Sequence, residues 1–172
     1  MENMTVVAFY LISKESGNLF AKVTELIAFS ETSTKFCGVF EGKNVVNLVE
    51  NFTESLLCIK HLGARDSIAH GLTALCQNIT HIPGKEYSEL TKGMLEKILN
   101  GLKTNKFQFI FRRSAGLPAA VTSLMKAEPK GRRTQLLPLA MDTLFDMAQD
   151  DTLQDVSKIH SLNILKYVFQ DA

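Results

Sequence analysis

The sequence predicts an all-α protein of the armadillo or HEAT type, built from stacked helical hairpins that form part of an α-solenoid. Apolar residues recur every three or four positions along most of the chain, which is the spacing of one face of an amphipathic helix. The breaks between these stretches are short, so neighbouring helices are expected to pack antiparallel. A helix pair recurs about every 40–50 residues, a period typical of such repeats.

About seven helices are predicted from this spacing. The stripe of Leu90, Met94, Ile98 and Leu102 is an example of the apolar face on which each prediction rests. The first helix has a weak point at Ser16-Gly17, where glycine favours a break. The predicted ranges are 4–29, 44–61, 65–79, 86–102, 113–126, 133–149 and 154–170.

One short stretch competes with the helical pattern. Phe107, Phe109 and Phe111 alternate with polar or smaller residues, and such alternation is also typical of a β-strand. A lone strand among helices would have no partner, so a buried loop or a helix entry is the favoured interpretation.

Composition places the chain in a broad class. Its 172 residues, 45 % of them hydrophobic, suffice for one domain, which we assign to residues 1–172. Three cysteines are an odd number at wide spacings, so reduced thiols and a cytoplasmic location are expected. The apolar start at 4–12 is too short to cross a bilayer, and no membrane association is expected.

The charge of the chain is strongly uneven. Residues 103–133 hold eight Lys and Arg residues and a single acid, Glu128, for a formal charge of +7. The two flanking parts carry −2 and −4. Such polarity usually indicates a partner, and a basic surface neutralises the phosphates of nucleic acids without reading their sequence. We expect these cations to gather at one corner of the scaffold.

Catalytic motifs are missing from the sequence. No glycine-rich loop follows a strand, as methyl transfer from a nucleotide-like cofactor would require. The four histidines lack the pairing of a metal site, and Cys58 with His61 supplies only two ligands. We therefore expect a protein that is not an enzyme and that binds no metal or cofactor.

A seven-residue motif lies inside the basic segment. The run Arg112-Arg113-Ser114-Ala115-Gly116-Leu117-Pro118 is followed by Glu128-Pro129 and a leucine-rich helix. With Lys14-Glu15, the stretch 60–64 and the stretch 159–165, it resembles the thyroid-adenoma-associated protein family over nearly the whole chain. Members of that family are far longer, so the resemblance implies a fragment or a truncated gene product.

The resemblance also implies a function. The family consists of armadillo-like proteins that assist an FtsJ-type methyltransferase without catalysing the reaction themselves. Together the two proteins 2′-O-methylate a ribose in the tRNA anticodon loop. The resemblance therefore implies a regulatory scaffold with tRNA and the methyltransferase as partners. The alternative is a protein-binding solenoid whose basic strip docks an acidic protein.

Candidate residues follow from the motif and from the charge. Gly116 is either a close-packing point or part of the binding surface, and Pro118 lies either in the first turn of a helix or at a kink. Lys14, Glu15 and Pro118 are taken as structural, as are His160 and Asn163, which share a helical face. The residues expected to bind tRNA or the partner are Arg112, Arg113, Ser114, Gly116, Lys126, Lys130, Arg132 and Arg133.

Solenoid repeats bury their faces against their neighbours. An isolated group of repeats should therefore expose apolar ends and associate with itself or with other proteins.

Overall fold

The computed structural model describes residues 2–29, 42–59, 61–82, 85–107, 116–128 and 135–170. Within these ranges the chain forms seven helices and no strand, which confirms the all-α, solenoid-like prediction. The helices are α1 (Glu2–Phe29), α3 (Gly42–Cys58), α4 (Leu62–Ile79), α5 (Lys85–Lys103), α6 (Gly116–Met125), α7 (Leu136–Gln149) and α8 (Asp155–Gln170).

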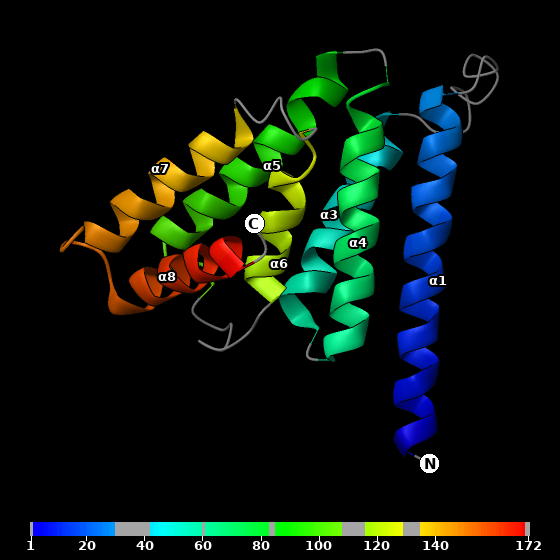
Figure 1. The fold of residues 1–172 in the computed structure, drawn as a ribbon, viewed down its shortest axis with the longest axis horizontal. Coiled ribbons are helices and arrows are strands. Elements are labelled where there is room, and N and C mark those ends of the chain that lie inside the picture. Colours follow the sequence, from blue (N-terminus) through cyan, green and yellow to red (C-terminus); the bar gives the residue numbers. More distant parts are fainter. Residues whose placement is uncertain are drawn as a thin grey trace.

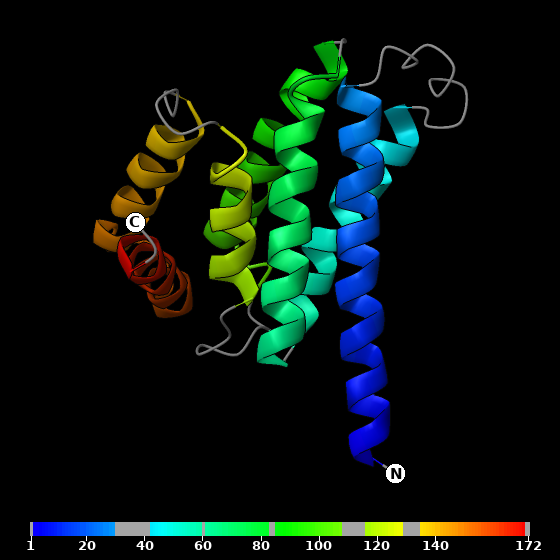
Figure 2. The same cartoon turned by 45° about the vertical axis from the view of Figure 1, so that its right-hand side comes forward.

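The described helices form successive layers. The long helix α1 lies on the outside, followed by α3 with α4, then α5 with α6, and then the hairpin of α7 and α8 (Figures 1 and 2). The direction of the chain alternates from α1 to α7, as expected for short connections (Figure 1). One apolar core runs through the layers from α3 to α8.

Helix α6 lies at the centre of this arrangement. It contacts α3, α4, α5, α7 and α8, and all ten of its residues are buried. Four of the ten are Ala, Ser or Gly, and such small side chains let neighbouring helices approach from several sides. The chain thus places its most apolar helix where no face meets water.

The first helix, predicted over 4–29 with a weak point at Ser16-Gly17, is continuous. Helix α1 continues through Gly17 because this glycine lies where α1 crosses α4. A Cβ atom on Gly71 would lie 3.0 Å from the Cα of Gly17, so the two backbones meet with no room for a side chain. Gly17 lowers the helix propensity of α1, but its lack of a side chain lets α1 and α4 pack closely.

Polar contacts add to the crossing of α1 and α4. The side-chain amide of Asn78 donates a hydrogen bond of 3.1 Å to the carbonyl of Ala21 and one of 3.3 Å to the hydroxyl of Thr24. The rings of Phe20 and Phe52 meet edge to face with their centroids 5.9 Å apart, and this contact joins α1 to α3. The outer helix is therefore held in a defined register.

The end of α5 accounts for the first of the alternating phenylalanines. Asn105 has a φ of 54°, and the amide of Lys106 donates to the carbonyl of Gly101 over 2.9 Å, as in a Schellman C-cap. The reversal brings Phe107 back onto α5. A Cβ on Gly101 would lie 2.6 Å from its ring. Phe107 is therefore part of the helix terminus, while residues 108–111 lie outside the described residues.

Two cysteines lie in described parts of the chain, and both are free thiols. Cys58 is exposed, whereas Cys76 is buried in the core, and burial raises the pKa of its thiol to about 12. The high pKa keeps Cys76 protonated at neutral pH, so it behaves as a small apolar side chain. None of the described helices combines the length and the hydropathy that a membrane span requires.

The glycine contact between α1 and α4 predicts a stability difference between two Gly→Ala substitutions. Gly71→Ala should lower the free energy of unfolding by about 1–3 kcal/mol, because the added methyl group meets the backbone of Gly17. Gly93 in α5 is the matched control, since a Cβ there meets nothing within 4 Å. Gly93→Ala should stabilise the chain by about 0.5–1 kcal/mol. Urea denaturation of both variants measures the difference, and equal effects would contradict the packing role.

The outward side of α1 predicts self-association. It exposes Leu19, which is 60 % accessible, together with Ile12 and Leu26, which lie one heptad before and one heptad after it. Replacing Leu19 and Leu26 by Lys should shift the chain towards monomer in sedimentation velocity, because the apolar seam is removed. Replacing the exposed Lys22 by Gln on the same helix is the control. A wild-type chain that sediments as a monomer at every concentration would contradict this prediction.

Candidate functional site

The motif that stands out in the sequence ends inside the central helix. Gly116, Leu117 and Pro118 form the first turn of α6, and all three are buried. Proline is tolerated there because the first residues of a helix have no intrahelical partner for an N–H group. Of the two alternatives for Pro118, the structure supports the first turn. Gly116 takes part in packing, so it does not belong to an open surface.

The basic part of the motif lies outside the described residues. Arg112, Arg113 and Ser114 precede α6, and the cations at 130, 132 and 133 precede α7. Their assignment to a binding surface stays a prediction from the sequence. The residues concerned are Arg112, Arg113, Ser114, Lys130, Arg132 and Arg133.

The described cations of the basic segment do not form one cluster. Lys103 ends α5 and lies near the turn between α7 and α8, where its charge contributes to lowering the pKa of Asp150. The main cause of that lowered pKa is a hydrogen bond from Thr152 to the Asp150 carboxylate. Lys126 follows the last residue of α6. Helix α6 runs in the opposite direction to α5, so the two helices end on opposite sides of the layer (Figure 1). The prediction that the cations gather at one corner of the scaffold is therefore wrong for Lys103 and Lys126.

The one acid of the segment has a structural partner. The carboxylate of Glu128 accepts hydrogen bonds from the backbone amides of Leu136, at 3.0 Å, and Gln135, at 3.2 Å. These amides begin α7, and a carboxylate there offsets the positive end of the helix dipole. Glu128 thus connects the end of α6 to the start of α7, because its carboxylate accepts hydrogen bonds from backbone amides there.

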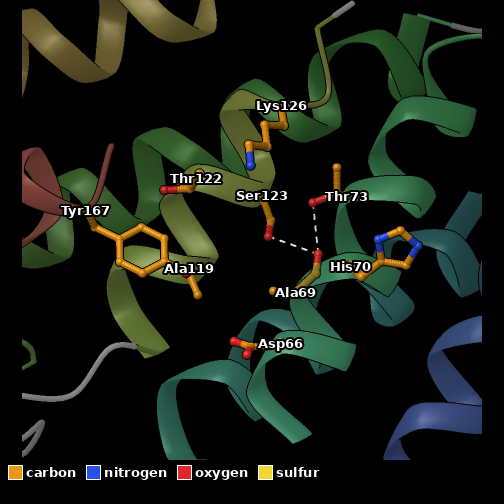
Figure 3. Close-up of a pocket in the computed structure, with 9 residues that line it drawn as sticks. All are labelled: Asp66, Ala69, His70, Thr73, Ala119, Thr122, Ser123, Lys126 and Tyr167. Carbon is orange, nitrogen blue, oxygen red and sulfur yellow. Dashed lines mark hydrogen bonds between the residues drawn. The ribbon is translucent and has the colours of Figure 1, made fainter. Parts of the chain in front are cut away.

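Lys126 lines a cavity of about 270 Å³ between α4, α6 and α8 (Figure 3). Each wall comes from one helix, and the polar lining residues of α4, Asp66, His70 and Thr73, are spaced three or four positions apart. The sequence interpretation placed only Lys126 among the candidate residues. The lining consists of Asp66, Ala69, His70 and Thr73 from α4, of Ala119, Thr122, Ser123 and Lys126 on the α6 side, and of Tyr167 from α8.

Hydrogen bonds fix the floor of this cavity. The hydroxyls of Ser123 and Thr73 both donate to the carbonyl of Ala69, over 3.0 Å and 2.8 Å (Figure 3). The side chain of Gln77 donates to the carbonyl of Lys126 over 2.8 Å and so holds the end of α6 against α4. The two walls are therefore locked together, and their polar atoms keep fixed positions.

The remaining structural candidates lie on α1 and α8. Lys14 is half-buried and Glu15 is exposed on α1. His160 is 3 % exposed and Asn163 is half-buried, both on α8. The burial of His160 fits a packing role, while a hydrogen-bonded pair with Asn163 stays a prediction. In the described ranges, no three His, Cys, Asp or Glu side chains come together as metal ligands would.

The chain was compared with known proteins. A family model described as THADA/TRM732, DUF2428 matches residues 1–172. The chain belongs to this family. The earlier resemblance to the thyroid-adenoma-associated proteins is thereby confirmed.

Among the relatives is the human tRNA (32-2′-O)-methyltransferase regulator THADA, which is 27 % identical over 98 % of this chain. The regulator trm732 of Schizosaccharomyces pombe is 30 % identical over 66 % of it. The chain spans only 9 % and 8 % of the length of these two THADA/TRM732 relatives. No solved structure matches it.

The buried first turn of α6 predicts that part of the THADA/TRM732 motif acts through stability. Leu117→Ala should cost about 2–5 kcal/mol in the free energy of unfolding, because Leu117 is fully buried in the core. Leu162→Ala is the control, since Leu162 is exposed on α8. Chemical denaturation followed by circular dichroism compares the two. Equal stability of both variants would show that α6 is not packed as described.

Proposed function

We propose that this chain is a non-catalytic part of a regulatory scaffold that assists an FtsJ-type methyltransferase in 2′-O-methylation of a ribose in the tRNA anticodon loop. The observation that carries the proposal is membership of the THADA/TRM732 family over the whole chain. Relatives named as tRNA (32-2′-O)-methyltransferase regulators support it. In this proposal the chain works in the cytoplasm as one repeat segment of an armadillo- or HEAT-type solenoid.

The physical contribution of the chain is a basic surface for tRNA. Residues 103–133 carry a formal charge of +7, and Lys and Arg release counterions when they neutralise phosphates. Such contacts position a nucleic acid without selecting its sequence. A scaffold with this surface raises the local concentration of tRNA at a partner enzyme, which then supplies the chemistry.

The layered helices suit this role because one apolar core joins them from α3 to α8. The buried α6 has the basic residues of the motif directly before it and the second basic stretch shortly after it. The two ends of one central helix thus anchor both charged segments. A fixed anchor lowers the entropic cost of holding a polyanion at two points.

The proposal is tested by Arg112→Ala combined with Arg113→Ala in the full-length gene product. Loss of two charge-assisted contacts should weaken tRNA binding roughly tenfold or more. It should also reduce the slope of log affinity against log salt by about two. Methylation of the anticodon-loop ribose by the complex with its methyltransferase should fall in parallel, and circular dichroism should be unchanged.

Lys92→Ala combined with Lys97→Ala is the control, because both are surface cations on α5 outside the basic segment, paired with Glu96 and Glu50. Unchanged methylation in the arginine variant would remove the pair from the mechanism. Competition distinguishes the alternative partner. If an acidic protein, and not tRNA, displaces the bound ligand of the basic segment, the chain is a protein-docking solenoid.

A further inference from the structure

The cavity between α4, α6 and α8 combines a cation, a carboxylate, hydroxyl groups and one aromatic ring. The side chain of Lys126 enters from one end and that of Asp66 lies at the other, while the ring of Tyr167 forms a side wall (Figure 3). These groups come from three helices that are far apart in the sequence. Their meeting in one cavity of about 270 Å³ points to a ligand with several chemically distinct parts.

The aromatic wall suits a planar ring. Tyr167 is half-buried, and the edge of its ring lies beside Ala119, whose small side chain leaves space next to the ring (Figure 3). Proteins recognise unpaired RNA bases by stacking them on such rings. The arrangement offers one stacking position, which is enough for a single base that has left its strand.

The polar walls suit the other parts of a nucleotide. Lys126 supplies positive charge for a phosphate. The hydroxyl oxygens of Ser123 and Thr73 already donate to the Ala69 carbonyl, so towards the cavity they act as acceptors. Asp66 accepts hydrogen bonds from the Arg65 guanidinium through its Oδ1 atom alone. Its Oδ2 atom takes part in neither bond and suits an amino or hydroxyl donor.

Thr122 is a buried polar residue in the wall of the cavity. This residue lines the cavity and is only 6 % exposed. Its hydroxyl makes no hydrogen bond with any other atom of the described chain. A buried hydroxyl without a partner costs roughly 1–3 kcal/mol, so this wall of the cavity is less stable than the walls with satisfied hydroxyls.

An acidic peptide fits these groups less well than RNA does. Its carboxylates would meet Lys126 favourably, but they would also meet the negative charge of Asp66. A nucleotide separates its anionic phosphate from its base, which carries hydrogen-bond donors. The two charged ends of the cavity therefore match the two ends of a nucleotide.

We propose that this cavity binds a single unstacked ribonucleotide of an RNA strand, with the base against Tyr167 and its phosphate near Lys126. The proposal rests on the proposed function, because it assumes that RNA reaches this face of the scaffold. It extends that function from neutralising a backbone to holding one nucleotide out of its strand.

The test compares two labelled ten-residue strands of equal charge, oligouridylate and an abasic ribose-phosphate strand, by fluorescence anisotropy with the complete 172-residue chain. The wild-type chain should bind oligouridylate roughly tenfold more tightly, since only that strand has bases to stack. Tyr167→Leu should abolish this preference, and Tyr167→Phe, which keeps the ring, should restore it. Lys126→Gln should reduce the salt slope for both strands by about 0.7. Thermal melts confirm that each variant is folded.

Outcomes for the two proposals differ. Equal binding of both strands, or a preference that survives Tyr167→Leu, would overturn the nucleotide cavity and leave the basic surface intact. Failure of both strands to bind would overturn the RNA contact of the proposed function together with the cavity. Arg112→Ala with Arg113→Ala should weaken the binding of both strands equally, because it removes positive charge and leaves the ring of Tyr167 in place. Displacement of oligouridylate by polyglutamate but not by uridine monophosphate would assign the cavity to an acidic peptide instead.

A second readout uses the lack of tryptophan in the sequence. Of the three tyrosines, Tyr10 and Tyr87 are replaced by Phe, which leaves Tyr167 as the one tyrosine fluorophore. Titration with oligouridylate should quench its emission, because a stacked base is in direct contact with the ring. Titration with the abasic strand should leave the emission unchanged. Equal emission changes with the two strands would contradict stacking.

Discussion

The burial of α6 is the constraint on which the other described layers depend. Its ten residues contact helices on both sides of it, so α6 joins the α3 and α4 layer to the α7 and α8 hairpin. A helix in this position has no solvent-facing stripe, which explains its apolar, small-residue composition. Substitutions that change its volume act on several layers at once. The hydrogen bonds donated by Gln77 and Ser123 then hold α6 against α4.

The burial of α6 divides the family motif into a part that acts on folding and a part that carries positive charge. Gly116, Leu117 and Pro118 shape the first turn of a buried helix, and any effect of changing them acts first on folding. Arg112 and Arg113 come before that turn, and the sequence predicts that their charge binds a polyanion. The same division recurs after the helix, where Lys126 lines a cavity while Glu128 caps α7. Architecture and binding are therefore interleaved within one segment of the chain.

Helical spacing predicted most of the fold because each helix carries its own periodic signal. The range 154–170 matches α8 closely, and 86–102 matches α5. The role of Gly17 could not be predicted, because it depends on Gly71, which lies in another helix. The cavity was missed for the same reason. Its polar residues are ordinary helix-surface types until packing brings Tyr167 beside Thr122. The recurrence of polar side chains at 66, 70 and 73 of α4 was the local signal in the sequence.

Helix α1 is attached differently from every other described element. Its backbone rests on α4 alone, through the glycine crossing and the two hydrogen bonds of Asn78, with the Phe20 ring as a further contact to α3. Among the side chains of α1 that the structure describes, none is a fully buried apolar member of the inner core. An element of this kind opens at a lower free energy than the global unfolding of the chain. Amide protons of α1 therefore exchange through partial opening, and the inner helices keep their protection while the outer layer separates and returns.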